Sequence, residues 1–123
     1  MKLLTHNMLQ SNMPGVTQPY PLRLEVSQVE QEENEFNKEF VVHMFPRLNY
    51  EVLVQALQQT GYSFLPDSLP ENHLENDNFL KLVHQALLNV NVVEGKLICP
   101  ETGRQYPITK GIPNMLLSEE ETG

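Results

Sequence analysis

The chain has 123 residues, and 40% of them are hydrophobic. This is enough to bury one core, and it excludes a chain that is disordered over its whole length. Its 16 acidic and 8 basic residues give a formal net charge of −8, which argues against a protein that binds nucleic acid with its own surface. The single cysteine rules out an intramolecular disulfide, and no apolar run approaches the ~20 residues that cross a membrane. We therefore expect a protein of the cytoplasm and nucleus.

The first third of the chain predicts two short strands. Apolar residues in the segment 3–9 indicate the first, and a loop rich in proline and glycine follows at residues 11–21. Residues 22–27 alternate between apolar and polar, which is typical of a half-buried strand. The acidic stretch 28–34 is predicted to be an exposed connection.

The middle of the chain predicts three helices, each with an asparagine at its start. Asn37 caps a short helix that Pro46 ends, and Asn49 caps a second helix that closes at Gly61. The third helix carries the clearest apolar stripe, from Phe79 to Val90, with Asn76 or Asn78 as its cap.

Extended segments return after the third helix. Residues 90–93 and 96–99 flank Glu94-Gly95, which is typical of a hairpin turn. Two more turns are predicted at residues 100–103 and 109–111, with a strand at 104–108 between them and a last extended run at 112–117. The acidic run Glu119–Glu121 is expected to be a solvated tail.

These elements predict an α+β fold. Strands from both termini form one small antiparallel sheet, and about three helices form an inserted lobe. The predicted division is a ribbon-like β domain of residues 1–34 and 91–123 with an inserted helical lobe of residues 35–90.

The sequence shows no group of residues that is typical of a catalytic site or a metal site. The six glycines stand in predicted turns or at the end of the chain, and none forms a phosphate-binding loop. A zinc site needs about four ligands, but Cys99 stands alone and the four histidines share no ligand spacing. We interpret Cys99 as a buried structural thiol.

The segment 112–117 is unusual because it is apolar and close to the C-terminus. Pro113 lacks a backbone donor, which suits an edge strand. A bare apolar edge promotes aggregation, so something should cover it. The pattern alone does not decide whether the chain's own helices or the sheet edge of another protein cover this segment, and the two alternatives are equal.

Three stretches carry a resemblance to a known family: residues 1–9, residues 93–104 and residues 108–117, the last ending in Gly-Ile-Pro-Asn-Met-Leu-Leu. They resemble the tRNA methyltransferase 112 homologue family, also called the multifunctional methyltransferase activator subunit. The resemblance covers the whole chain in order, and it implies a zinc-ribbon-like sheet built from both termini with a helical insertion.

The resemblance also implies a function. Such a chain is no enzyme but a regulatory subunit that forms a heterodimer with class I methyltransferase catalytic subunits. These modify tRNA, small-subunit rRNA and a translation termination factor, and they hold S-adenosylmethionine themselves. No direct contact with nucleic acid or membrane is implied. The implied partner-binding residues lie in the N-terminal and C-terminal extended segments: Thr5, His6, Asn7, Leu9, Gly111, Ile112, Pro113, Asn114, Met115, Leu116 and Leu117.

The sequence differs from this family at the residues that bind zinc. Fungal members carry four zinc-binding cysteines, whereas only Cys99 stands here, Thr102 follows three residues later, and no cysteine follows Leu9. We therefore expect no metal and no cofactor in this chain. Three other functions stay open: a ribbon module that contacts RNA, an enzyme that uses Cys99 or a histidine as nucleophile, and an adaptor of an unrelated complex.

Overall fold

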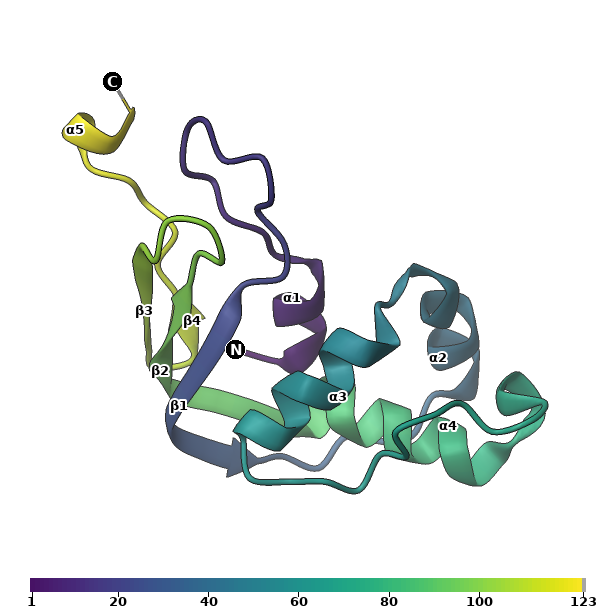
Figure 1. The fold of residues 1–123 in the computed structure, drawn as a ribbon. Helices are drawn as coiled ribbons and strands as arrows, with labels where there is room; N and C mark the ends of the chain where they lie inside the picture. The colour runs from purple at the N-terminus through teal and green to yellow at the C-terminus, as the bar shows by residue number, and fades with distance from the viewer. Residues whose placement is uncertain (123) are drawn as a thin grey trace.

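The computed structural model describes residues 1–122, which form a four-stranded antiparallel sheet beside a group of helices (Figure 1). The strands follow the order β1-β2-β3-β4 across the sheet, so β1 and β4 are its two edges. The α+β fold and the sheet built from both ends of the chain are therefore confirmed. The strands are β1 (Arg23–Gln31), β2 (Val90–Ile98), β3 (Gln105–Thr109) and β4 (Ile112–Pro113).

β1 is longer than its alternating pattern indicates. The strand continues to Gln31, which pairs with Val90 of β2, so the exposed connection predicted for residues 28–34 is wrong as far as Gln31. The pairing shifts register around Ser27, where Val26 lies opposite Gly95 and Gln28 opposite Glu94. The second half of β1 is mostly exposed, so no apolar residue pattern marks it as a strand.

β2 runs without interruption from Val90 to Ile98, so the hairpin turn predicted at Glu94-Gly95 is wrong. Gly95 pairs with Val26 of β1 and with Ile108 of β3. A Cβ atom on Gly95 would lie 2.3 Å from the carbonyl oxygen of Glu25. Glycine is required here by the close approach of two strands and not by a turn.

The three predicted helices are present: α2 (Lys38–Met44), α3 (Tyr50–Gln59) and α4 (Asp77–His84). Asn37, Asn49 and Asn76 cap them as predicted, since each side chain accepts a hydrogen bond from a backbone N–H in the first turn. α4 continues through the π-helical segment Gln85–Asn89 directly into β2. Short 3-10 turns occupy Phe45–Arg47 and His73–Glu75.

The N-terminal segment is a helix, α1 (Leu3–Met8), and the predicted N-terminal strand is wrong. Its buried positions are Leu3, His6 and Asn7, which have helical spacing. Two of these three side chains are polar, so the apolar residues alone do not reveal the helix. Asn7 joins α1 to α3: its amide nitrogen donates to the Asn49 carbonyl over 2.9 Å, and its oxygen accepts from the Asn49 N–H over 3.0 Å.

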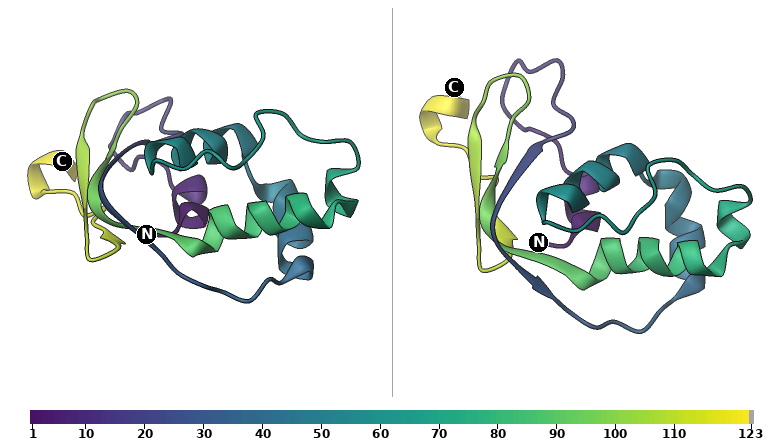
Figure 2. Two further views of the ribbon diagram at one scale, coloured as in Figure 1. Left: turned by 90° about the horizontal axis from the view of Figure 1, so that it is seen from below. Right: turned by 60° about the horizontal axis from the view of Figure 1, so that its bottom comes forward.

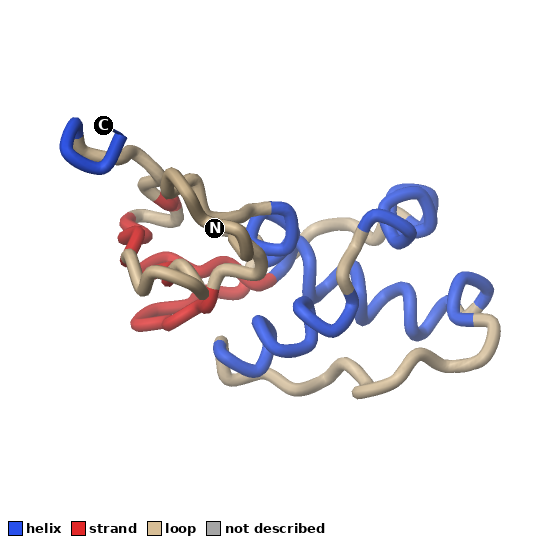
Figure 3. The backbone as a smooth tube through the Cα atoms, turned by 45° about the horizontal axis from the view of Figure 1, so that its top comes forward, coloured by secondary structure: helices blue, strands red, loops and turns tan. Residues whose placement is uncertain are grey.

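The sheet lies at one end of the molecule, and α2, α3 and α4 lie at the other (Figures 2 and 3). One cluster of buried residues contains members of both parts, among them Leu80 and Leu87 from the helical part and Leu97 and Tyr106 from the sheet. The division into a ribbon and an inserted lobe stays a prediction. In the part of the chain described, no helix is both long and apolar enough to cross a membrane.

Candidate docking edge

A tight turn joins β3 to β4 at the edge of the sheet. Lys110 and Gly111 have φ angles of 51° and 78°, so both lie in the left-handed region that two-residue hairpin turns use. The Gly111 N–H donates to the Val93 carbonyl over 2.9 Å, which ties the turn to β2. The turn predicted at residues 109–111 is therefore confirmed, and it leads into residues 111–117, which contain β4 and lie at the open edge of the sheet. We call residues 111–117 the docking edge.

The docking edge alternates between exposed and partly buried side chains. Ile112 is 68% exposed and Leu116 is 81% exposed, whereas Met115 and Leu117 are partly buried against the core. Ile112, Met115 and Leu116 line a shallow groove of about 730 Å³ together with neighbours that include Asn12 and Thr109. In the described chain the exposed side chains are covered by no helix, so the alternative in which the chain covers its own edge is wrong.

One backbone hydrogen bond to β3 and one side chain hold the docking edge just beyond β4. The Asn114 N–H donates to the Pro107 carbonyl of β3 over 2.9 Å, and Asn12 donates to the Met115 carbonyl over 2.7 Å. Because consecutive residues of an extended chain turn their N–H groups to opposite sides, the Met115 N–H faces away from β3. The Met115 carbonyl lies on this same outer side and is already held by Asn12, so the backbone group left for another strand at Met115 is its N–H.

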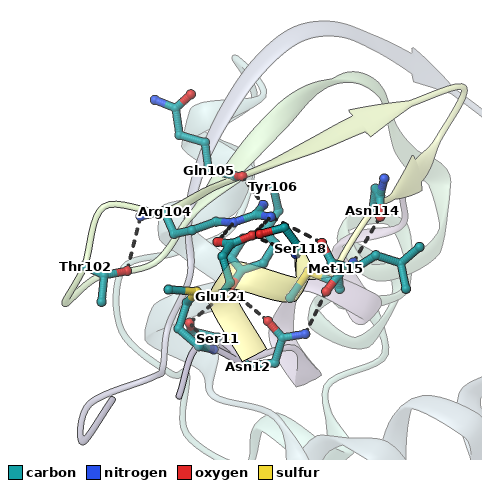
Figure 4. Close-up of polar contacts among 12 residues, drawn as sticks. Ser11, Asn12, Thr102, Arg104, Gln105, Tyr106, Asn114, Met115, Ser118 and Glu121 are labelled. Atoms are coloured by element: carbon teal, nitrogen blue, oxygen red, sulfur yellow. Dashed lines mark hydrogen bonds and ion pairs between the residues drawn. The ribbon is translucent and has the colours of Figure 1, made fainter. Parts of the chain in front are cut away.

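Arg104 ties the C-terminal tail to β3 (Figure 4). Its Nε and one Nη each donate to a carboxylate oxygen of Glu121 over 2.8 Å, and the same Nη donates to the Leu116 carbonyl over 3.2 Å. The guanidinium lies 4.6 Å from the ring centre of Tyr106, which is fully buried. Glu121 also accepts a hydrogen bond from the Ser118 N–H. The acidic run forms most of the short helix α5 (Glu119–Thr122) and is thus partly paired within the chain.

The carboxyl group of Glu121 is expected to titrate well below its ordinary pKa of 4.5. The hydrogen bond from Arg104, followed by the one from the Ser118 N–H, lowers the pKa of Glu121 to about 2. The pair therefore contributes its full stabilisation above the ordinary value, and loses it as the pH falls through about 2. A carbon-13 NMR titration of this carboxyl should show the low midpoint, and Arg104→Gln should return it towards 4.5. An ordinary midpoint in the unmodified chain would contradict the tail contact.

The N-terminal residues implied by the resemblance are only partly at the surface. Thr5 is exposed and Leu9 is partly buried against the core, but His6 and Asn7 are 3% and 4% exposed. His6 and Asn7 hold α1 in place through hydrogen bonds with the Leu22 carbonyl and with Asn49, so both are almost withdrawn from the surface. Met8 is 46% exposed on the same helix.

Three residues that hold the docking edge in place were not predicted. Asn12 lies in a polar loop, Arg104 stands beside a predicted turn, and Glu121 belongs to an acidic tail. Contacts between side chains so far apart in the sequence leave no periodic pattern. The one sequence feature that could have indicated the Arg104–Glu121 pair is an arginine followed later in the chain by a run of glutamates.

The residues around Cys99 do not fit a zinc ion. Burial by itself raises the pKa of the Cys99 thiol, but hydrogen bonds with Ser11 and Thr102 outweigh it and lower the pKa to about 7. Hydroxyl groups stand where further ligands would be needed, and Ser11 also contacts the Tyr106 hydroxyl over 3.2 Å. Within the described residues, no group of three or more His, Cys, Asp or Glu side chains could hold a metal ion.

The fold and its open edge define a class: small α+β proteins whose sheet ends in an uncovered apolar strand edge. The family model described as "Trm112p-like protein" matches residues 2–111 of this chain. The chain belongs to the Trm112p-like family.

Relatives match along their whole length. A protein of Mus musculus named multifunctional methyltransferase subunit TRM112-like protein is 47% identical, over 99% of this chain and 98% of its own. Homolog A of Arabidopsis thaliana, also named a multifunctional methyltransferase subunit, is 46% identical over 98% and 99%. A chain in the structure of the E. cuniculi Mtq2–Trm112 complex, described as responsible for methylation of the termination factor eRF1, is 26% identical with a TM-score of 0.61, covering 94% of this chain and 95% of that chain.

Proposed function

We propose that this chain is a non-catalytic subunit that binds class I methyltransferases and stabilises them as heterodimers. The observation that carries the proposal is the docking edge: an apolar, open strand edge with Ile112 and Leu116 largely exposed. An extended segment of another protein can add to such an edge through backbone hydrogen bonds, and apolar side chains then supply the affinity. Family members named as methyltransferase subunits, and a related chain in complex with Mtq2, support the same function.

The docking residues divide into those that contact the partner and those that hold the edge. Ile112 and Leu116 enter the interface, and the Met115 N–H pairs with the partner strand. Pro113 and Leu117 complete the edge, Asn114 hydrogen-bonds at its rim, and Gly111 allows the turn. Thr5 and Leu9 contact the partner beside this edge, whereas His6 and Asn7 hold α1 in place and do not belong to the docking edge.

The methyltransferase supplies the chemistry in this proposal. It holds S-adenosylmethionine and the catalytic residues, and its substrates are tRNA, small-subunit rRNA or a termination factor. This chain adds no nucleophile, because Cys99 is only 1% exposed and substrate cannot reach it. The net charge of −8 also leaves the recognition of RNA to the partner.

Activation follows from mass action. A subunit that binds only the folded methyltransferase stabilises it by RT ln(1 + [L]/Kd), about 4 kcal/mol when the subunit is present at ~1,000 times its Kd. It also covers an apolar strand edge of the methyltransferase that would otherwise aggregate. The fraction of enzyme that is folded and able to bind its cofactor therefore rises, with no change in the catalytic groups.

Co-expression tests this function directly. A class I methyltransferase related to Mtq2 should be largely insoluble when produced alone, and soluble and active when produced with this chain. The measurement is the soluble yield together with the rate of methyl transfer to the termination factor. A methyltransferase that is equally soluble and active without this chain would contradict the proposal.

A further inference from the structure

The opposite edge of the sheet carries a cavity that the docking proposal does not use. It lies between the start of β1 and α3 and has a volume of about 410 Å³, which is within the ~300–1,000 Å³ range of ligand sites. Residues 21–25 line it without a gap. Neighbouring side chains of a strand point to opposite faces, so a cavity lined by consecutive residues lies along the backbone edge of β1.

The peptide groups of Leu24 face this cavity. The Leu22 carbonyl points away from β2, because it accepts a hydrogen bond from His6 Nε2 of α1 over 2.7 Å. The Glu25 carbonyl points towards β2, since a Cβ on Gly95 would lie 2.3 Å from it. Consecutive residues turn their N–H and C=O groups to opposite sides. The N–H and C=O of Leu24 therefore point outwards, on the side where no strand of the described chain pairs with β1.

His6 adds an unused acceptor to this cavity. It lines the cavity and is 3% exposed, and its Nδ1 is the one buried side-chain nitrogen or oxygen without a hydrogen-bond partner among the described residues. Burial lowers the pKa of His6 more than the Leu22 contact raises it, so the ring is neutral at pH 7. Because Nε2 donates to the Leu22 carbonyl, Nδ1 carries a lone pair that a ligand donor could fill.

The rest of the lining suits a peptide better than a phosphate-bearing ligand. α3 contributes the buried Val52 and Ala56, and three exposed glutamines form the rim. Arg23 makes no ion pair within the described part of the chain, whereas Glu25 pairs with Lys96 over 3.3 Å. The lining thus combines an apolar floor, neutral amides and one available positive charge, without the basic cluster that binds phosphates.

We propose that this cavity binds an extended peptide segment of a third protein. The segment pairs with Leu24 as an added strand, donates a hydrogen bond to His6 Nδ1 and places a carboxylate beside Arg23. β1 and β4 are opposite edges of one sheet, so this segment and the partner at the docking edge do not compete. The subunit would then join the methyltransferase to a further protein.

An NMR titration of the full chain tests the proposal. The probe is an acetylated, amidated hexapeptide of alternating valine and threonine that contains one glutamate. We expect saturable shifts of the Leu24 amide and of His6 Nδ1, with the Met115 amide unchanged. Gln59→Trp, at an exposed rim position, should weaken the peptide affinity at least about tenfold, and Gln10→Trp, at an exposed position away from the cavity, should leave it unchanged.

Each other outcome overturns this inference. The peptide could fail to cause saturable shifts at millimolar concentration, could shift Met115 instead of Leu24, or could bind Gln59→Trp as well as the unmodified chain. Gln59→Trp should still yield soluble, active methyltransferase on co-expression. A negative result for peptide binding at the cavity is therefore distinguishable from a negative result for the proposed function.

Discussion

Leu116→Asp is expected to weaken binding to a class I methyltransferase at least about 30-fold. An apolar residue at the centre of an interface is worth roughly 2 kcal/mol or more, and every 1.4 kcal/mol is about tenfold in Kd. A carboxylate buried there without a partner adds a further cost. Leu116 is 81% exposed in this chain, so its own fold should be unaffected. Calorimetric titration of the purified methyltransferase with each variant measures the effect.

Leu69→Asp is the matched control for this prediction. Leu69 is 44% exposed in the loop between α3 and α4, remote in sequence from the docking edge. It should bind like the unmodified chain. Equal binding by Leu116→Asp would show that the docking edge is wrongly placed. Met115→Asp is a less selective test, because Met115 also packs against the core and its loss could act through the fold.

Gly95→Ala is expected to destabilise the chain by about 3 kcal/mol, the upper end of what overpacking costs. The added Cβ would lie 2.3 Å from the Glu25 carbonyl oxygen and 3.2 Å from Val26 Cα, and both are backbone atoms that cannot rotate away. β1 and β2 must therefore separate locally. The melting temperature should fall by about 10 °C, which a thermal melt followed by circular dichroism would measure.

Gly103→Ala separates this steric effect from the general effect of replacing a glycine. Gly103 has a φ of 77°, and no atom lies within 4 Å of the place that a Cβ would take, so only backbone strain of about 1 kcal/mol opposes alanine. The two variants should differ clearly in melting temperature. Similar melting temperatures would mean that the strands can move apart at Gly95 with little cost.

The contacts within the chain prepare the docking edge for binding. Asn12 holds the Met115 carbonyl, and Arg104 holds the Leu116 carbonyl together with Glu121. A segment that is already extended loses less conformational freedom on binding than a flexible one, so more of its contact energy appears as affinity. Variants at Asn12 or Arg104 should therefore act on affinity without removing any side chain from the interface.

Local chemistry in the sequence was enough to predict the three helices α2, α3 and α4 in the middle of the chain. Asn37, Asn49 and Asn76 each precede an apolar helical stripe, and each caps the helix that follows. The caps act through hydrogen bonds within three residues, so the sequence contains the whole signal. The turn at residues 109–111 and the edge position of Pro113 are equally local, because they depend on a positive φ and on a missing donor.

The errors occur where distant residues decide the structure. Gly95 was predicted to be in a turn, but β1 approaches so closely that only glycine fits a straight strand there. His6 and Asn7 were predicted to lie on a strand, but they are buried on a helix, where the Leu22 carbonyl and the Asn49 backbone satisfy them. A buried polar side chain is stable only with such partners, and these lie 16 and 42 residues away.

The sequence by itself therefore determined the fold class, the three capped helices and the apolar segment 112–117. Only the tertiary structure decided that this segment stays uncovered, that Arg104 and Asn12 hold it extended, and that a cavity opens at the other edge of the sheet. The physical reason is the range of the interactions. Caps, turns and periodicity act between near neighbours, whereas coverage of an edge depends on where the whole chain places its helices.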